Sequence, residues 1–205
     1  MHQQPNRSYT STRRAQQAAQ TRADIVAAAT ALFQQNGWRG TTITSIAAKA
    51  GVVPDTVYAG FGSKRALLVA AKDAARDGDA EDVAAVRQAD LEKISTGTRA
   101  QRIAVAVRLI AAANERTRAI DAVWREAAAG DPALAKELRK REDGRRSAFG
   151  AAMTAALDAP PDEQTLDGIW AITGSEVYAK LIGGRGWTST RYQQWLAETF
   201  DRLLP

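Results

Sequence analysis

Two short helices joined by a glycine turn are predicted in residues 42–64, which read TITSIAAKAGVVPDTVYAGFGSK. Apolar residues at helical spacing give the first of these helices one buried face: Ile43, Ile46, Ala47 and Ala50. Gly51 predicts its end, because glycine adopts a left-handed backbone at little cost, and Pro54 predicts the first turn of the second helix. Such a pair forms a helix-turn-helix, whose second helix can enter the major groove of DNA.

Longer helices are predicted on both sides of this motif. One runs from about Arg22 to Gln35 with Thr21 as its cap, and its buried stripe is Ile25, Ala28, Ala29, Leu32 and Phe33. Another begins after a Ser63 cap and runs to about Arg76. Within the motif, the expected caps are Thr44 and Asp55, and the expected inward-facing side chains of the second short helix are Val57, Tyr58 and Phe61.

The order of these residues resembles the DNA-binding signature of the TetR family of transcriptional regulators. The resemblance covers about the first third of the chain and rests on Ile25 to Ala29, Leu32-Phe33, Gly37, Thr42-Ile43, Ile46-Ala47, Ala50-Gly51-Val52, Val57-Tyr58, Phe61, Lys64 and Leu67-Leu68. Gly60 departs from the pattern, since the family often has histidine or another larger side chain there. The resemblance implies a helix-turn-helix regulator that acts as a homodimer on double-stranded DNA.

Charge is distributed unevenly along the chain. Residues 1–76 carry ten Lys or Arg against three acidic residues, whereas the remainder carries 18 against 20. A basic N-terminal third indicates a polyanionic partner. Residues 1–20 are polar and rich in glutamine, and we expect a flexible arm that bears Arg7, Arg13 and Arg14. This arm either reaches phosphates or a minor groove or is a tail without a defined contact.

Specific DNA binding needs contacts to phosphates and to base edges. The hydroxyls of Thr42 and Thr44 are candidate phosphate ligands, and the resemblance implies phosphate contacts at Tyr58 and Lys64. Base reading falls to the outer face of the second short helix, which offers Val53, Pro54, Asp55 and Thr56. The alternatives are that Tyr58 is a core aromatic, that Lys64 is a solvated charge, and that Asp55 only caps its helix.

The rest of the chain also reads as helical. Helices are expected at about 80–93, 99–129 with a break near 116, 132–157 with Asp131 as cap, 162–182 and 189–204. The predicted fold is therefore all-α with about nine helices, and no sheet is expected. The expected division is a flexible arm at 1–20, a DNA-binding domain at 21–76, and a ligand-binding and dimerisation domain at 77–205.

The last two helices resemble the C-terminal pair of many actinobacterial TetR-like regulators, which packs against its twofold mate. The resemblance implies a dimer interface that draws on Ile169, Val177, Leu181, Trp195, Leu196, Thr199, Phe200 and Leu203. Two recognition helices must meet half-sites about 34–36 Å apart, so a dimer suits the function. The alternative is that these apolar stripes are core packing within one chain.

The resemblance also implies a small-molecule effector bound among the C-terminal helices. Asn114 lies in register with apolar residues, and the other candidate lining residues are Arg108, Trp124 and Trp170. The alternative is a satisfied core amide with tryptophans that only fill the core. Few polar candidates favour a largely apolar or aromatic ligand.

Catalysis and cofactor binding find little support in the sequence. The only histidine is His2, there is no cysteine, and no cluster has metal-ligand spacing. No apolar run approaches the length of a membrane span, and the N-terminus lacks the apolar core of a signal peptide. We therefore expect a cytoplasmic protein without cofactor or metal, and the TetR resemblance implies a ligand-responsive regulator, commonly a repressor. The alternative is a helical small-molecule binding protein or enzyme with an incidental basic N-terminus.

Overall fold

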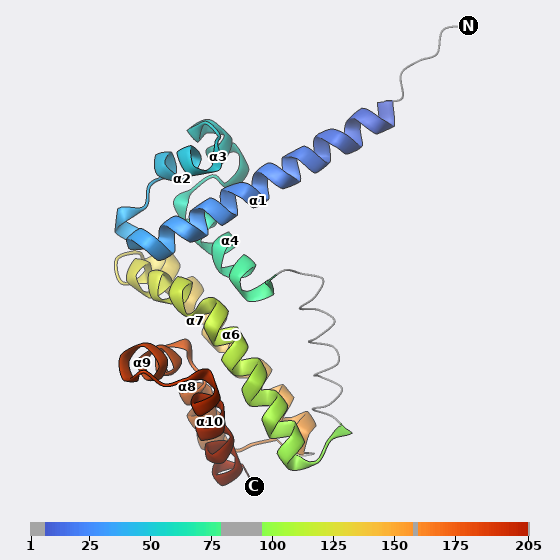
Figure 1. Ribbon diagram of the computed structural model, residues 1–205, viewed down its shortest axis with the longest axis vertical. Helices are drawn as coiled ribbons and strands as arrows, with labels where there is room; N and C mark the ends of the chain where they lie inside the picture. The colour runs from blue at the N-terminus through green and yellow to red at the C-terminus, as the bar shows by residue number, and fades with distance from the viewer. Residues whose placement is uncertain (1–6, 79–95, 158–159, 205) are drawn as a thin grey trace, which may run out of the picture. The chain divides into compact units, whose positions relative to one another are not determined.

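A computed structural model describes residues 7–78, 96–157 and 160–204. The helix predicted at 80–93 and the first six residues of the predicted arm lie outside the described residues. Within the described ranges the regular structure consists of nine helices without a strand (Figure 1). The all-α prediction is confirmed.

The chain divides into two compact units, Met1–Ala74 and Ala75–Pro205. In the first unit the helices are α1 (Arg7–Gly40), α2 (Ile43–Ala50), α3 (Pro54–Phe61) and α4 (Lys64–Asp77), the last of which crosses the boundary. In the second they are α6 (Arg99–Ala128), α7 (Pro132–Leu157), α8 (Glu163–Ile172), α9 (Ser175–Arg185) and α10 (Ser189–Leu203).

The core of the first unit is formed by apolar side chains from all four of its helices. The buried members are Ile25, Ala28, Ala29, Phe33, Ile46, Ala47, Val57, Leu67, Leu68 and Ala71. Those on α1 belong to the predicted stripe, and Leu32 is half-buried beside them. This packing holds α2 and α3 in a fixed arrangement, which short helices cannot maintain alone.

The first helix is longer than predicted at its N-terminal end. It begins at Arg7 instead of Arg22, so residues expected in a flexible arm are helical. Thr21 does not cap it but lies inside it, and its hydroxyl donates to the Gln17 carbonyl at 3.0 Å. Alanine, glutamine and arginine favour helix, and no glycine or proline interrupts residues 7–36. The helical backbone breaks at Gly37 (φ 69°) before a last turn to Gly40.

The caps of the two short helices differ from those predicted. Thr42, instead of Thr44, caps α2. Its side chain accepts from the Ser45 N–H at 3.0 Å, and the Ser45 hydroxyl accepts from the Thr42 N–H. A cap needs an extended backbone, which Thr42 has and a residue inside the helix lacks. Gly51 ends α2 with φ 69°, and Pro54 opens α3, both as predicted. Asp55 does not cap α3: its N-cap is Val53, without a side-chain bond.

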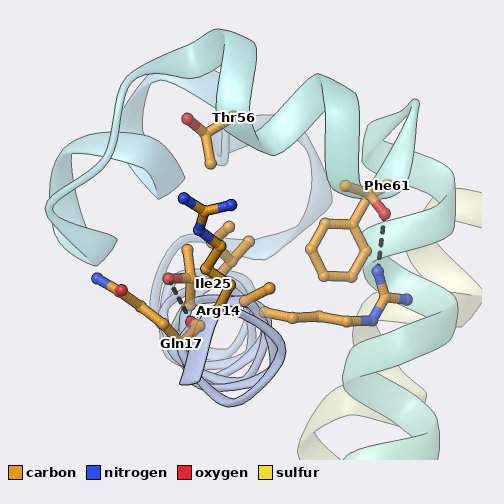
Figure 2. A pocket seen from close by; sticks show the side chains of 9 residues that line it. Arg14, Gln17, Ile25, Thr56 and Phe61 are labelled. Atoms are coloured by element: carbon orange, nitrogen blue, oxygen red, sulfur yellow. Dashed lines mark hydrogen bonds between the residues drawn. The ribbon is translucent and has the colours of Figure 1, made fainter. Parts of the chain in front are cut away.

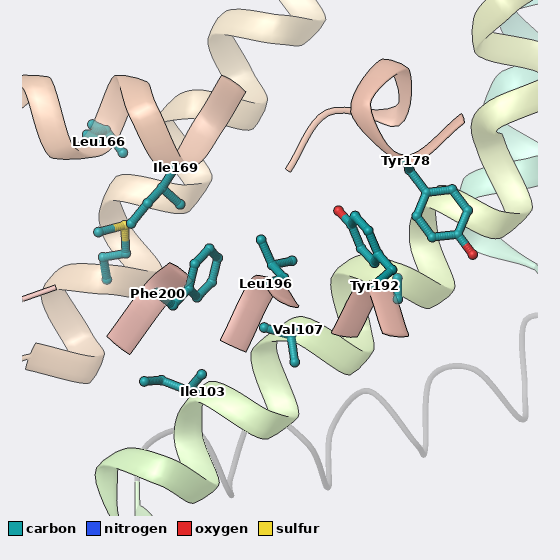
Figure 3. Close-up of a cluster of buried hydrophobic side chains, with 10 residues drawn as sticks. Ile103, Val107, Leu166, Ile169, Tyr178, Tyr192, Leu196 and Phe200 are labelled. Carbon is teal, nitrogen blue, oxygen red and sulfur yellow. The ribbon is translucent and has the colours of Figure 1, made fainter. Parts of the chain in front are cut away.

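The second unit packs α6 against α7, α9 and α10. Figure 3 shows Leu196 and Phe200 of α10 lying between Ile103 and Val107 of α6 and Ile169 of α8, while Tyr192 lies beside Tyr178 of α9. The helix predicted near 99–129 runs unbroken, and Asp131 caps α7 as predicted through bonds to the N–H groups of Ala133 and Leu134.

The helix predicted at 162–182 is interrupted. It forms α8 and α9, which separate at Thr173 and Gly174. The Asn114 amide donates to the Thr173 carbonyl at 3.1 Å, and the Arg145 guanidinium donates to the Thr173 hydroxyl at 3.2 Å. Side chains from α6 and α7 therefore stabilise the interruption between α8 and α9. Because these partners are distant in the sequence, the local pattern did not predict the interruption.

Candidate nucleic-acid interface and buried polar cluster

The outer face of α3 exposes large apolar side chains. Val53, just before the helix, is 63% exposed and Tyr58 is 53% exposed, and Pro54 and Asp55 are also exposed. Tyr58 was expected to face inward, but only Val57 is fully buried on this short helix. The exposed residues present methyl groups, an aromatic ring and a carboxylate, which suit contact with base edges and thymine methyl groups.

Thr56 lies on the side of α3 that borders α1. There, a hollow of about 410 Å³ opens between the two helices. Its lining comprises Arg14, Gln17, Ala18, Thr21, Arg22, Ile25, Thr56, Gly60 and Phe61. In Figure 2 the Arg14 guanidinium points from α1 toward Thr56. The flank of α3 is thus lined by a hydroxyl and by two cationic side chains.

Arg22 holds the end of α3. Its guanidinium donates to the Gly60 carbonyl at 2.7 Å and lies 4.1 Å from the centroid of the Phe61 ring. The last carbonyls of a helix lack intrahelical partners, so this bond caps α3. Sequence reasoning missed Arg22 because the contact spans 38 positions and leaves no local pattern.

Besides Tyr58 on α3, the predicted phosphate ligands lie at the starts of α2 and α4. Thr42 and Thr44 are exposed at the start of α2, where backbone N–H groups carry the positive end of the helix dipole. Lys64 is half-buried at the start of α4: its ammonium donates to the Trp38 carbonyl and lies 4.1 Å from the Trp38 ring centroid. Lys64 therefore also ties α4 to the last turn of α1.

The segment that contains the helix-turn-helix matches a known family. The family model described as "Bacterial regulatory proteins, tetR family" matches residues 25–71, from the packed stripe of α1 into α4. The N-terminal unit carries a TetR-family domain. The resemblance drawn from residues 25–68 is thereby confirmed.

Solved structures share the fold of this chain over most of its length. A candidate TetR-family transcriptional regulator from Mesorhizobium loti has a TM-score of 0.69 at 18% identity, covering 91% of this chain and 96% of that one. A TetR-family member from Streptomyces coelicolor A3 has a TM-score of 0.64 at 23% identity, covering 90% and 98%. The multidrug binding protein EbrR, complexed with imidazole, has a TM-score of 0.62 at 21% identity, covering 90% and 94%. No curated protein matches the chain.

A cluster of polar groups lies inside the second unit, around the interruption between α8 and α9. Asn114 and Thr173 are buried, and Arg145 donates to the Thr173 hydroxyl and to the Trp170 carbonyl at 3.1 Å. Arg145 also pairs with Glu142 at 3.0 Å. The cluster thus joins side chains from α6, α7 and α8.

Two donors in this region have no hydrogen-bond partner among the described residues, the Trp170 indole N–H and the Tyr192 hydroxyl. Burial, the largest influence, raises the pKa of Tyr192 to about 12, and the Asn114 side chain acts in the opposite direction. A buried donor without an acceptor is unfavourable, so the pair would gain from an acceptor brought by a ligand or water.

The four predicted lining residues have different environments. Asn114 and Trp170 belong to the buried cluster. Trp124 is fully buried between α6 and α7, where its indole N–H donates to the Leu134 carbonyl at 3.3 Å. Arg108 is exposed. Tyr192 and Arg145 were missed, although Tyr192 precedes Leu196 and Phe200 at helical spacing and is the polar member of that stripe.

The residues predicted for the dimer interface also separate into two groups. Ile169, Leu196 and Phe200 are buried in the core of a single chain, so their side chains offer no surface to a partner. The others are half-buried or exposed on α9 and α10: Val177, Leu181, Trp195, Thr199 and Leu203. An interface on these helices would use the second group.

None of the residues in 7–78, 96–157 and 160–204 forms a group of three or more potential metal ligands. None of the helices there combines the length and apolar character needed to cross a membrane.

Proposed function

We propose that this chain is a ligand-responsive transcriptional repressor that binds a palindromic operator as a homodimer. The observation that carries the proposal is the exposed face of α3, where Val53 and Tyr58 are left uncovered within a basic helix-turn-helix unit. Large apolar side chains exposed on a recognition helix are suited to the apolar and polar edges of base pairs.

The phosphate contacts in this proposal come from residues around α3. Thr42 and Thr44 would use the N-terminus of α2, and Tyr58 would use its exposed hydroxyl. Lys64 would reach a phosphate from the start of α4 while it stays near Trp38, since an ammonium carries three N–H donors. Val53, Pro54, Asp55 and Thr56 would contact bases or the adjacent backbone.

The homodimer would form through α9 and α10. Val177, Leu181, Trp195, Thr199 and Leu203 supply a partly exposed, largely apolar surface on these two helices. A twofold interface presents two identical recognition helices, and two such helices read two halves of a palindrome.

The effector would bind at the buried polar cluster. The unpaired donors of Trp170 and Tyr192 select a molecule with an acceptor oxygen, and the surrounding apolar core selects a largely apolar body. EbrR, with its bound imidazole, supports small-molecule binding by this fold. The effector would release DNA only if it binds the DNA-free conformation more tightly than the DNA-bound one.

A mobility-shift titration tests the proposal directly. The probe is the DNA upstream of the chain's own gene, titrated at two salt concentrations against random duplex of equal length. We expect a clear preference for the upstream DNA and a steep loss of binding as salt rises, because phosphate contacts release counterions. Equal affinity for the two duplexes at moderate salt would contradict the proposal.

The same titration separates the second candidate, a helical small-molecule binding protein whose basic N-terminus is incidental. The buried unpaired donors favour a ligand under either candidate. Ligand binding without any sequence preference for DNA would support the second candidate over a regulator.

A further inference from the structure

The N-terminal part of α1 brings a cationic side chain to the edge of α3. Arg14 lies on the extension of α1 beyond the packed stripe, and its guanidinium lines the hollow beside Thr56 (Figure 2). Arg14 makes no hydrogen bond or ion pair with any residue in the described part of the chain. Arg22, on the same wall, is held by the Gly60 carbonyl and the Phe61 ring. Arg22 is therefore held by contacts with α3, whereas the Arg14 guanidinium can bind another group.

The dimensions of an α-helix and of the DNA major groove indicate which part of the DNA would lie beside this hollow. An α-helix with its side chains is about 10–12 Å across, and the major groove is about 12 Å wide. A helix seated in the groove fills it and has a sugar–phosphate backbone along each flank. Thr56 and Gly60 are one turn apart on the flank of α3 that borders the hollow. Groups in the hollow thus come within reach of a phosphate.

We propose that the hollow is a phosphate-binding subsite in which Arg14 of α1 and the Thr56 hydroxyl of α3 hold one DNA backbone phosphate. This rests on the proposed function and extends the DNA interface to a part of α1 outside the helix-turn-helix. The planar guanidinium can donate two parallel N–H bonds to a phosphate, and the hydroxyl adds a third donor. Arg22 acts as a positioning residue, because it fixes the end of α3 that forms one wall of the hollow.

Gly60 keeps this subsite accessible. A Cβ placed on Gly60 would meet no atom within 4 Å, so the space beside it is open. The half-burial of Thr56 fits the same assignment, since its side chain faces the hollow instead of the exposed face formed by Val53 and Tyr58.

Fluorescence anisotropy with a labelled duplex of the upstream DNA tests the role of Arg14. Arg14→Ala is compared with Arg13→Ala, a neighbouring exposed arginine that does not line the hollow. We expect Arg14→Ala to weaken binding roughly tenfold and to reduce the slope of log affinity against log salt by about 1. Arg13→Ala should leave both nearly unchanged, and Arg14→Lys should retain the slope but lose part of the affinity. Equal effects of the two alanine variants would overturn the subsite.

Thr56→Val tests the second ligand against duplexes that each carry one altered base pair. A phosphate contact predicts the same loss on every duplex, whereas loss of discrimination at one or two positions would assign Thr56 to base reading and overturn its place in the subsite. Wild-type protein that shows no preference for the upstream DNA would instead defeat the proposed function itself. Wild-type preference together with an unaffected Arg14→Ala variant would defeat the subsite alone.

Discussion

Tyr178 links two helices of the second unit through one hydrogen bond. It is buried, its ring packs edge-on against Tyr192 with centroids 4.8 Å apart, and its hydroxyl donates to Glu115 of α6 at 2.7 Å. The hydroxyls of Tyr178 and Tyr192 point in different directions in Figure 3, so that only one of them reaches this carboxylate. The Tyr178 hydroxyl, followed by Arg118, lowers the pKa of Glu115 below its ordinary value of 4.5.

The lowered pKa predicts a pH-dependent effect of Tyr178→Phe. Because Glu115 binds its proton more weakly in the folded state, it stabilises the fold above its ordinary pKa and loses that contribution as pH falls through the lower folded value. Tyr178→Phe removes the larger cause, so we expect it to lower the melting temperature most near neutral pH and progressively less in acid. Thermal melts from about pH 7 to about pH 3 measure this. A Glu115→Gln background is the control, in which the effect of Tyr178→Phe should no longer vary with pH.

Among the elements, α2 depends on its cap more than the longer helices do. It has eight residues, and helices of this length do not form alone in water. The Thr42–Ser45 capping box satisfies N–H groups at its start, and Gly51 ends it in a left-handed turn. The same threonine is exposed and is a proposed phosphate ligand, so under the proposed function one residue serves both stability and DNA binding.

Thr42→Ala and Thr44→Ala should therefore separate capping from DNA contact. We expect Thr42→Ala to lower the free energy of unfolding by about 1 kcal/mol through loss of the cap, and Thr44→Ala to leave it nearly unchanged. Chemical denaturation of the DNA-free protein measures both values. If the two variants destabilise the protein equally, the assignment of the cap to Thr42 is wrong.

The helix-turn-helix could be predicted well because its determinants are local. Gly51 and Pro54 mark their turns through their own backbone preferences, and the stripe on α1 repeats at helical spacing. The interruption at Thr173 could not be predicted, since its partners Asn114 and Arg145 lie on other helices.

Prediction of the candidate sites was limited in the same way. The exposed side chains of α3 follow from its position in the motif, but the clamp from Arg22 to Gly60 joins distant parts of the chain. The N-terminal extension of α1 is a different case. Its polar composition was interpreted as an arm, although its alanine and glutamine content also favours helix.

At the scale of the whole molecule, the burial of apolar residues distinguishes those that pack within one chain from those that can contact a second chain. Leu196 is completely buried in the core of the second unit, whereas Val177 on α9 and Leu203 on α10 retain exposed surface. Helices that meet a partner keep apolar surface outside the core of their own chain. Substitutions at the two kinds of position should therefore have different consequences.

Val177→Asp should separate association from folding. We expect this charge to convert a dimer to a monomer at micromolar concentration, because an unpaired carboxylate is costly to bury at an interface. Leu196→Ala should instead lower the free energy of unfolding by about 2–5 kcal/mol and leave the folded protein dimeric. Analytical ultracentrifugation measures mass and denaturation measures stability. A wild-type monomer would contradict the proposed interface, as would a Val177→Asp variant that stays dimeric.

Gly60 also bears on how a chain like this one can change through mutation. Its backbone φ is outside the left-handed region, and the space around it is open, so a side chain can be added without strain or clash. Almost any other residue would also favour the helix more than glycine does. A single substitution at position 60 can thus add a new contact beside the recognition helix without loss of stability. Under the proposed function, an altered operator preference is accessible to natural selection, or to an engineer, in one step from this sequence.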